Sequence, residues 1–346
     1  MTEDAVREYL ARYDGPELRL MEVCGSHTAA IAKNGISDML SPRIRLISGP
    51  GCPVCVTPTA YIDRLISLAE TPGCAVVTFG DLLRVPGGRG TLQEASGRGG
   101  DVRMVYSPFD ALVMAEKEPS VTFIMAAVGF ETTTPLYALM MEDILEKKLT
   151  NLKLLTALKT MPAVIEHLLE NGAAVDGFLA PGHVAVVTGS GIFRPLAEKW
   201  QMPFAVAGFD GMSLLRAIYV LARARGRGEV FNLYPQVVTE EGSTVAQALT
   251  ARYFEPGPAL WRGLGVVPAS GRLLKAELAA YDAGSDGLND DSGTNEACCC
   301  GSVLAGRMSP PDCPLFGRVC TPLTPQGACM VSAEGSCHTY YSYHRR

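Results

Sequence analysis

The stretch Thr122-Phe-Ile-Met-Ala-Ala-Val-Gly-Phe-Glu-Thr-Thr-Thr134 begins with an apolar run and ends in a polar loop. Residues 122–128 have the length and composition of a β-strand, and Thr134–Lys147 repeats its apolar side chains with a helical period. The run Lys153–Ala157 that follows is again strand-like. This order of strand, helix and strand predicts a βαβ unit with parallel strands.

The same alternation extends in both directions, from about residue 17 to about residue 225. Further strands are expected at Leu18–Val23, Arg43–Ile47, Ala75–Phe79, Val102–Tyr106, Gly177–Leu179 and Phe204–Ala207. Further helices are expected at 1–14, Thr59–Leu68, Phe109–Lys117, Pro162–Glu170 and Met212–Ala224. Thr57-Pro58 is a typical helix start, with Thr as the N-cap and Pro in the first turn.

This number of strands suits two Rossmann-like open-sheet α/β domains facing a cleft better than one very wide sheet. We expect a first α/β domain with an N-terminal helix at 1–118 and a second at 119–230, with the seam at the turn 116–119. Residues 231–281 are expected to return and pack on these domains. Residues 282–346 are expected to form a linker, rich in Gly, Asp, Ser and Asn, and a small cysteine-rich module.

Composition excludes several classes of protein. The 346 residues carry 30 Lys and Arg against 36 Asp and Glu, a net charge of −6, which argues against nucleic-acid binding through a basic surface. Hydrophobic residues make up 47%, enough for a large core. Uncharged stretches such as Gly177–Phe193 contain Gly, Pro and His, so no membrane span is expected. The acidic N-terminus does not resemble a signal peptide, and we expect a cytoplasmic protein.

Unusual loops follow the predicted strands, at the edge where open α/β sheets bind ligands. They are Cys24-Gly-Ser-His27, Gly49-Pro-Gly-Cys-Pro-Val-Cys55, Gly80-Asp81, Gly129-Phe-Glu-Thr-Thr133, Pro181-Gly-His183 and Gly208-Phe-Asp210. Taken singly, the polar residues Asp81, Glu131, His183 and Asp210 are more typical of loop-stabilising groups than of catalysts. Together the loops predict a shared cleft.

Cys52-Pro-Val-Cys55 lies just before a predicted helix, where the helix dipole favours the thiolate form. The spacing suits either a reversible disulfide or a shared metal ion. Cys24-Gly-Ser-His27 pairs a thiol with an imidazole, for metal binding or base-assisted thiol chemistry. The stretch Pro86-Gly-Gly-Arg-Gly90 resembles a flexible lid more than a phosphate-binding loop.

Seven of the eleven cysteines lie between Cys298 and Cys337. In a reducing compartment such clusters are more often metal ligands or redox thiols than disulfides. Cys300, Cys313, Cys320 and Cys337 are 13, 7 and 17 residues apart, wider than the close pairs of structural zinc sites. An iron–sulfur cluster is therefore favoured, with zinc and disulfides as alternatives. Cys74, in an apolar run, is expected to be a buried small hydrophobe.

Two strings, Met21-Glu-Val-Cys-Gly-Ser-His-Thr28 and Gly49-Pro-Gly-Cys-Pro-Val-Cys-Val-Thr-Pro58, resemble motifs of the HypD family of [NiFe]-hydrogenase maturation proteins. The resemblance continues in order along nearly the whole chain. It includes Thr78-Phe-Gly-Asp81, Arg84-Val-Pro86, Tyr106-Ser-Pro108, Gly129-Phe-Glu-Thr-Thr133, Ala180-Pro-Gly-His-Val184, Trp261-Arg-Gly-Leu-Gly265, Cys300-Gly-Ser-Val-Leu304, Cys313-Pro-Leu-Phe-Gly317 and Met330-Val-Ser-Ala-Glu-Gly-Ser-Cys337.

The resemblance implies a redox-capable scaffold on which an iron carrying cyanide and carbon monoxide, the Fe(CN)2CO fragment, is assembled. It implies a HypC-like small chaperone and a cyanide donor of the HypE–HypF system as partners. Cys24 would bind the iron, shared with a cysteine of the chaperone, and Cys52 and Cys55 would be a redox dithiol. His27, Asp81 and Glu334 match motifs near this chemistry. The implied [4Fe-4S] ligands are Cys300, Cys313, Cys320 and Cys337.

The sequence departs from the family pattern at two places. Ser26 stands where the family usually has a second Gly, and Cys298-Cys-Cys300 offers three thiols where one ligand is needed. Cys300 is favoured because it directly precedes the Gly-Ser-Val-Leu motif, with Cys298 and Cys329 as possible substitutes.

An assembly scaffold is favoured over an enzyme that turns over. The rival interpretation is an iron–sulfur-dependent disulfide reductase acting through Cys52 and Cys55, which leaves Cys24 and His27 without a role. A third interpretation, a zinc-stabilised interaction protein, accounts only for the C-terminal cysteines.

Overall fold

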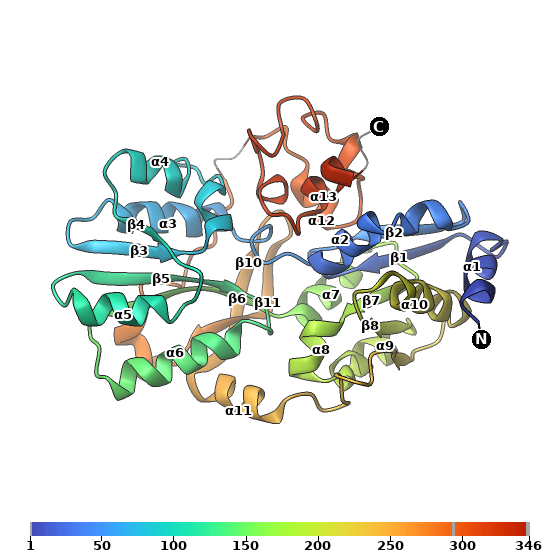
Figure 1. Cartoon of the computed structure of the whole chain (residues 1–346), viewed down its shortest axis with the longest axis horizontal. Coiled ribbons are helices and arrows are strands. Elements are labelled where there is room, and N and C mark those ends of the chain that lie inside the picture. Colours follow the sequence, from blue (N-terminus) through green and yellow to red (C-terminus); the bar gives the residue numbers. More distant parts are fainter. Residues whose placement is uncertain (1, 293–294, 344–346) are drawn as a thin grey trace.

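Two β-sheets stand side by side and a cysteine-rich C-terminal segment lies against both, in a computed structural model that describes residues 2–292 and 295–343 (Figure 1). Sheet A has five parallel strands in the order β2-β1-β7-β8-β9. Its strands are β1 Leu18–Glu22, β2 Ile44–Ser48, β7 Gly177–Pro181, β8 Phe204–Ala207 and β9 Val230–Asn232.

Sheet B has six strands in the order β10-β11-β6-β5-β3-β4. The strands β6, β5, β3 and β4 run parallel, whereas the hairpin β10–β11 joins β6 in the antiparallel direction. The bounds are β3 Cys74–Thr78, β4 Val102–Met104, β5 Thr122–Gly129, β6 Leu152–Lys159, β10 Phe254–Trp261 and β11 Gly265–Leu274.

Helices cover the faces of both sheets, as parallel strands require. They are α1 Glu3–Ala11, α2 Gly25–Lys33, α3 Thr59–Ala69, α4 Leu92–Gly97, α5 Asp110–Lys117, α6 Thr134–Glu146, α7 Met161–Glu170, α8 Gly182–Thr188, α9 Arg194–Trp200, α10 Gly211–Arg223, α11 Thr244–Tyr253, α12 Cys300–Leu304 and α13 Ser336–Tyr343. Within the residues described, none of these helices combines the length and the apolar composition that a membrane span needs.

The expected α/β class with two open sheets is confirmed, and every expected strand is present to within two residues at each end. The domain boundary expected near residue 118 does not separate the two sheets, because β3, which precedes it, pairs with β5, which follows it. Likewise β1 pairs with β7, more than 150 residues later. Each sheet therefore combines early and late segments of the chain. The hairpin β10–β11 and the helix α11 were not predicted.

One apolar cluster connects the two sheets with the C-terminal segment. It contains Met21 of β1, Phe130 after β5 and Trp261 at the end of β10, together with Cys55 and Cys329. Phe130 and Trp261 stack with their ring centroids 5.7 Å apart. The C-terminal segment is therefore part of the main core.

The connection to that segment is held against α3. Residues 293 and 294 of the expected linker, and residues 344–346 at the chain end, lie outside the described residues. Asp291 accepts a hydrogen bond from the backbone N–H of Thr59 at 3.2 Å and one from Gly263 at 2.8 Å. The helix starts at Thr59 as expected, but this distant carboxylate caps it, whereas Thr57 bonds to the carbonyl of Pro53.

Candidate thiol centre

The loops after β1 and β2 lie against each other at the carboxyl end of sheet A. These strands are neighbours, with Leu20 opposite Leu46, so their following loops leave the sheet side by side. Gly25 donates a backbone hydrogen bond to the carbonyl of Gly51 at 3.0 Å. A Cβ on Gly51 would lie only 2.3 Å from the backbone nitrogen of Cys24, so only glycine permits this approach.

Cys24 is the N-cap residue of α2 and is buried. The Glu22 carboxylate, buried in β1, accepts a hydrogen bond from the Cys24 backbone N–H at 3.0 Å and another from the Thr28 hydroxyl. Burial raises the pKa of the Cys24 thiol to about 12, against the opposing effect of the backbone N–H groups of His27 and Ser26. Burial also raises the pKa of Glu22 to about 8.

His27 points into the protein interior. Its Nε2 lies 3.3 Å from the carbonyl oxygen of Ala207 at the end of β8, while Nδ1 is buried without a partner among the described residues. A carbonyl oxygen can only accept a hydrogen bond, so Nε2 must carry a proton. Burial lowers the pKa of His27 to about 4. The imidazole is therefore neutral at pH 7 and packs on Phe209, with ring centroids 4.9 Å apart.

The thiols of Cys52, Cys55 and Cys329 are in contact. The Cys52 sulfur accepts a hydrogen bond from the Cys55 backbone N–H at 3.3 Å, the Cys55 thiol donates to the carbonyl of Ala328 at 3.9 Å, and all three cysteines belong to one buried cluster. The expectation of a thiolate-favouring site fails for Cys55, because burial raises the pKa of that thiol well above its usual range. Gly335 permits the contact, since a Cβ there would lie 3.0 Å from the Cys55 sulfur.

Cys329 continues this contact into the C-terminal segment. The neighbouring thiols of Cys300, Cys337 and Cys55 hold the pKa of Cys329 well below its usual range. The backbone N–H of Cys337 also donates to that sulfur, at 3.3 Å. Thiols that are hundreds of residues apart in the chain thus form one connected group.

All the cysteines from Cys298 to Cys337 face one small apolar cavity. Besides Val303, Phe316, Gly327 and Met330, its walls are Cys298, Cys299, Cys300, Cys313, Cys320, Cys329 and Cys337. The four cysteines expected to bind a cluster are therefore together, with the two possible substitutes beside them. Among the described residues no group of three or more His, Cys, Asp or Glu side chains is arranged around a single metal ion.

Asp81 and Glu334 fasten the C-terminal segment to the two sheets. Ser332 donates a hydrogen bond to Asp81, which follows β3 of sheet B, at 3.1 Å. Glu334 accepts one from Ser26, in the first turn of α2, at 2.9 Å. Both carboxylates are exposed, and their contacts indicate a positioning role.

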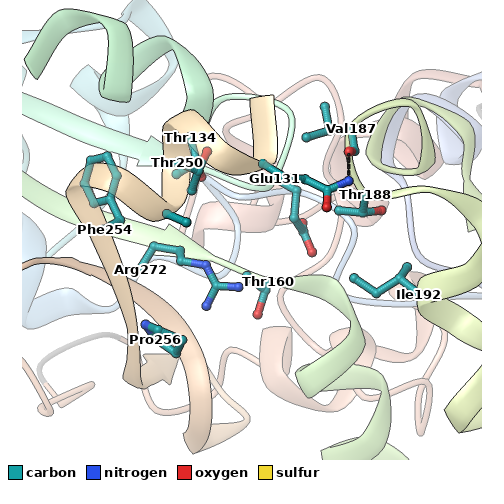
Figure 2. Close-up of a pocket in the computed structure, with 12 residues that line it drawn as sticks. Glu131, Thr134, Thr160, Val187, Thr188, Ile192, Thr250, Phe254, Pro256 and Arg272 are labelled. Carbon is teal, nitrogen blue, oxygen red and sulfur yellow. Dashed lines mark hydrogen bonds between the residues drawn. The ribbon is translucent and has the colours of Figure 1, made fainter. Parts of the chain in front are cut away.

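The remaining strand-end loops contribute no thiol to the centre. Asp210 caps α10 through the backbone N–H groups of Met212 and Ser213. His183 stacks on Phe209 with ring centroids 4.0 Å apart. Glu131 lines a separate cavity that contains no cysteine (Figure 2).

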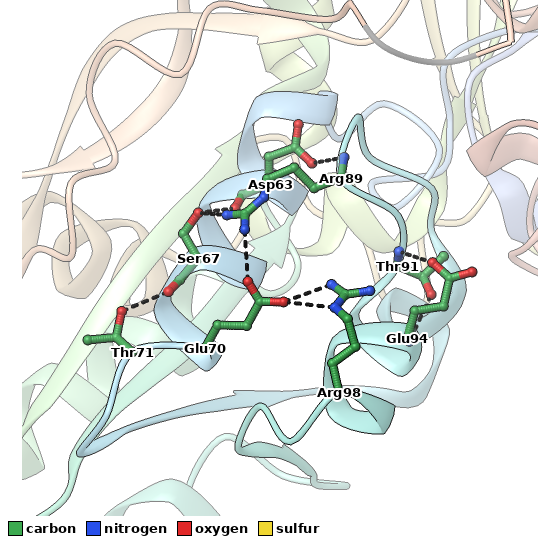
Figure 3. Close-up of polar contacts among 8 residues, drawn as sticks. All are labelled: Asp63, Ser67, Glu70, Thr71, Arg89, Thr91, Glu94 and Arg98. Carbon is green, nitrogen blue, oxygen red and sulfur yellow. Dashed lines mark hydrogen bonds and ion pairs between the residues drawn. The ribbon is translucent and has the colours of Figure 1, made fainter.

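The stretch 86–90 is fastened to α3 and does not have the freedom expected of a lid. Asp63 accepts hydrogen bonds from the backbone N–H groups of Gly88 and Arg89, and the Arg89 side chain reaches Ser67 and Glu70 (Figure 3). Arg98 binds the same Glu70 at 2.8 Å. Hydrogen bonds from Arg98 and the nearby charge of Arg89 lower the pKa of Glu70.

Sequence reasoning missed the role of Glu22 and the central place of Cys329. A charged residue inside the apolar strand Leu18–Val23 was the available signal for Glu22. No local signal distinguishes Cys329 from its neighbours, because its contacts come from residues far away in the chain.

Ten of the eleven cysteines surround the carboxyl end of sheet A or the adjoining segment, which defines a cysteine-rich α/β protein with a candidate thiol and metal centre. The family model described as HypD, hydrogenase formation hypA family, matches residues 2–344. The chain belongs to this HypD family of hydrogenase maturation factors.

Individual relatives agree with this membership. The hydrogenase maturation factor HypD of Rhizobium leguminosarum bv. viciae is 42% identical over 359 residues, covering 100% of this chain and 93% of the relative. HypD of Azotobacter vinelandii is 42% identical, with 95% and 90% covered. HypD of Cupriavidus necator is 40% identical, with 96% and 91% covered.

Proposed function

We propose that this protein is a redox-capable scaffold on which the Fe(CN)2CO fragment of the [NiFe] active site is assembled. It acts in the cytoplasm with a HypC-like small chaperone and receives cyanide from a HypE-like donor. The observation that carries the proposal is the connected group of thiols, which places Cys52 and Cys55 between the Cys24 loop and the C-terminal cysteines.

Cys24 is the residue proposed to bind the iron fragment, as substrate, together with a cysteine of the chaperone. A thiolate is a soft ligand that suits low-spin iron. Cys24 lies at the first turn of α2, where Glu22 fixes its backbone N–H and Gly51 brings the dithiol loop alongside. The iron would thus be held beside Cys52 and Cys55.

Cys300, Cys313, Cys320 and Cys337 are proposed to hold a [4Fe-4S] cluster. Seven thiols around one apolar cavity are more than a single zinc ion can bind, and four of them suit a cluster of several irons. When bound, such a cluster supplies one-electron transfer.

Cys52 and Cys55 are proposed as the redox dithiol. Forming a disulfide between them releases two electrons and two protons, and reduction takes the same number back. Their contact with Cys329 provides a short path between this pair and the C-terminal cysteines. Asp81 and Glu334 keep the C-terminal segment in place for this contact.

The test replaces Cys24 with Ala in the full chain, co-purified with the chaperone and without oxygen. Infrared bands of iron-bound cyanide and CO should disappear, because the iron loses its ligand from this chain. Iron and acid-labile sulfide should stay at the parent level. The matched control is Cys74→Ala, on β3 of sheet B, which should leave the infrared bands intact. Full loading of the Cys24→Ala complex would refute the assignment.

The alternative is an iron–sulfur-dependent disulfide reductase that acts through Cys52 and Cys55. The contact of Cys55 with Cys329 favours this candidate as much as the scaffold, but leaves the buried Cys24–Glu22 arrangement without a purpose. Reduction of a disulfide substrate at an unchanged rate by the Cys24→Ala protein, without any partner, would favour the reductase.

A further inference from the structure

A second cavity of about 260 Å³ lies where elements of both sheets meet, and none of its walls is a cysteine. Sheet B contributes the loop after β5, the end of β6 and the hairpin β10–β11. Sheet A contributes α8, and α11 closes one side (Figure 2). Ligand sites are common at such junctions between α/β units.

Glu131 lines this cavity, and one of its carboxylate oxygens has no hydrogen-bond partner among the described residues. Oε1 of Glu131 accepts a hydrogen bond from the backbone N–H of Met161 at 2.7 Å, which fixes the carboxylate at the end of β6. Oε2 is buried and has no hydrogen-bond partner among the described residues. An unsatisfied buried carboxylate oxygen is costly, so a donor from a ligand would stabilise it.

A guanidinium group points into the same cavity from β11. The Arg272 side chain makes one hydrogen bond among the described residues, at 3.3 Å to the carbonyl of Gly271, and the nearby charge of Glu131 offsets part of the lowering of the Arg272 pKa that burial causes. Figure 2 shows Arg272 and Glu131 directed into the cavity from different elements, with Thr160 near the guanidinium. The two opposite charges are therefore close to each other but free to bind a third group between them.

Apolar side chains form the rest of the wall, among them Val187, Ile192 and Phe254. The cavity thus combines the Arg272 guanidinium, which can bind an anion, with the Glu131 carboxylate, which can accept a hydrogen bond, and with an apolar wall. Arginine binds carboxylates with two parallel hydrogen bonds. Carboxylate oxygens accept from N–H groups.

We propose that this cavity binds a small molecule or chain end in which a carboxylate is adjacent to an N–H group and an apolar side chain. Arg272 binds the carboxylate and Glu131 accepts the N–H. Free α-amino acids and peptide C-termini share this chemistry. The site is separate from the thiol centre, because the two cavities share no lining residue.

The test uses isothermal titration calorimetry on the full chain with four named probes. L-leucine represents a free amino acid, and N-acetyl-L-leucine represents a peptide C-terminus. 4-Methylpentanoate lacks the N–H, and N-acetyl-L-leucinamide lacks the carboxylate. Burial raises the pKa of Glu131 to about 7, so titrations at pH 8 keep the acceptor mostly ionised.

We expect either L-leucine or N-acetyl-L-leucine to bind. Binding of L-leucine would identify a free amino acid as the ligand, and binding of N-acetyl-L-leucine would identify a peptide C-terminus. The two truncated probes should bind at least about tenfold more weakly, because each leaves one charged group unpaired. Arg272→Gln and Glu131→Gln should each weaken the better probe by a similar factor. Absence of binding by both leucine probes, or equal binding of all four, would overturn the proposal.

A second pair of variants covers the case in which a polar substitution disturbs folding. Ile192→Trp should fill the cavity from its partly exposed side and abolish binding. Leu139→Trp, at an exposed position of α6 outside the cavity, should leave binding unchanged. Circular dichroism melting of each variant reports folding. Unchanged affinity in a folded Ile192→Trp protein would contradict the assigned site.

Discussion

The carboxyl ends of sheets A and B occupy equivalent positions in the fold but present different chemistry. At sheet A, the loops after β1 and β2 present Cys24, Cys52 and Cys55, which are buried beneath the C-terminal segment. At sheet B, the ends of β5 and β6 present the charged side chains Glu131 and Lys159.

This difference shows that buried thiols and buried charged groups place different demands on the surrounding protein. Buried thiols can be packed in apolar surroundings because a neutral thiol is a small hydrophobe with weak hydrogen-bonding needs. A buried carboxylate or ammonium group needs a partner, or its pKa shifts toward the neutral form. The thiols at sheet A are therefore packed in the apolar core, whereas Glu131 and Lys159 at sheet B line cavities.

The largest expected effect tests whether only the sheet A side binds iron. Replacing Cys337 with Ser should remove most of the iron and acid-labile sulfide, about four of each per chain when intact, because a cluster ligand is lost. Cys74→Ser, on β3 of sheet B, should retain the parent content. Both are measured by chemical analysis of protein purified without oxygen. Equal iron and sulfide contents in the two variants would mean that the cysteines at the sheet A side are not the ones that bind iron.

A smaller effect tests how tightly the thiols are packed at sheet A. Gly335→Ala would place a Cβ 2.1 Å from the carbonyl oxygen of Cys329 and 3.0 Å from the Cys55 sulfur. The backbone must move, so we expect the free energy of unfolding in urea to fall by about 2–4 kcal/mol.

The matched change near sheet B is Gly97→Ala in α4, where a Cβ meets no atom within 4 Å. Its free energy of unfolding should stay within about 1 kcal/mol of the parent value. If Gly335→Ala were equally harmless, the thiol packing at sheet A would be looser than the structure shows.

The smallest effect concerns Lys159 at the end of β6. Burial lowers its pKa to about 7, partly offset by the charge of Asp291, and its ammonium nitrogen lies 5.8 Å from the centre of the Trp261 ring. The unfolded chain, with a lysine pKa near 10.4, binds more protons between these values, so stability rises with pH in that window.

Between pH 7 and 8 the parent should gain about 1 kcal/mol in the free energy of unfolding relative to Lys159→Met, less than the full slope because folded Lys159 is already about half deprotonated at pH 7. Urea unfolding at the two pH values measures this difference, and Lys153→Met on the same strand serves as the control that should show no such gain. Parallel pH profiles for the parent and Lys159→Met would mean that the charge at this end of sheet B has access to water.

Many of the strands and helices were predictable from the sequence, because local patterns of residues encode them. The run Thr122–Val128 and the helix after it were placed correctly, since apolar period and length distinguish these elements. The antiparallel hairpin β10–β11 was missed, because Pro and Gly interrupt its alternation, as at Pro256 and Gly257. The domain boundary expected at residue 118 did not predict which strands share a sheet. Strand order depends on how distant segments of the chain pair, and local sequence patterns do not encode that pairing.

The sequence by itself determined the α/β class, the thiol motifs at Cys24 and at Cys52-Pro-Val-Cys55, and the resemblance to a maturation family. Such features depend on residue types and on neighbours in the chain. The tertiary structure decided that Cys329 contacts Cys55 and that Glu131 keeps an unpaired oxygen beside Arg272. Those outcomes depend on burial and on contacts between segments more than 100 residues apart, which sequence spacing does not specify.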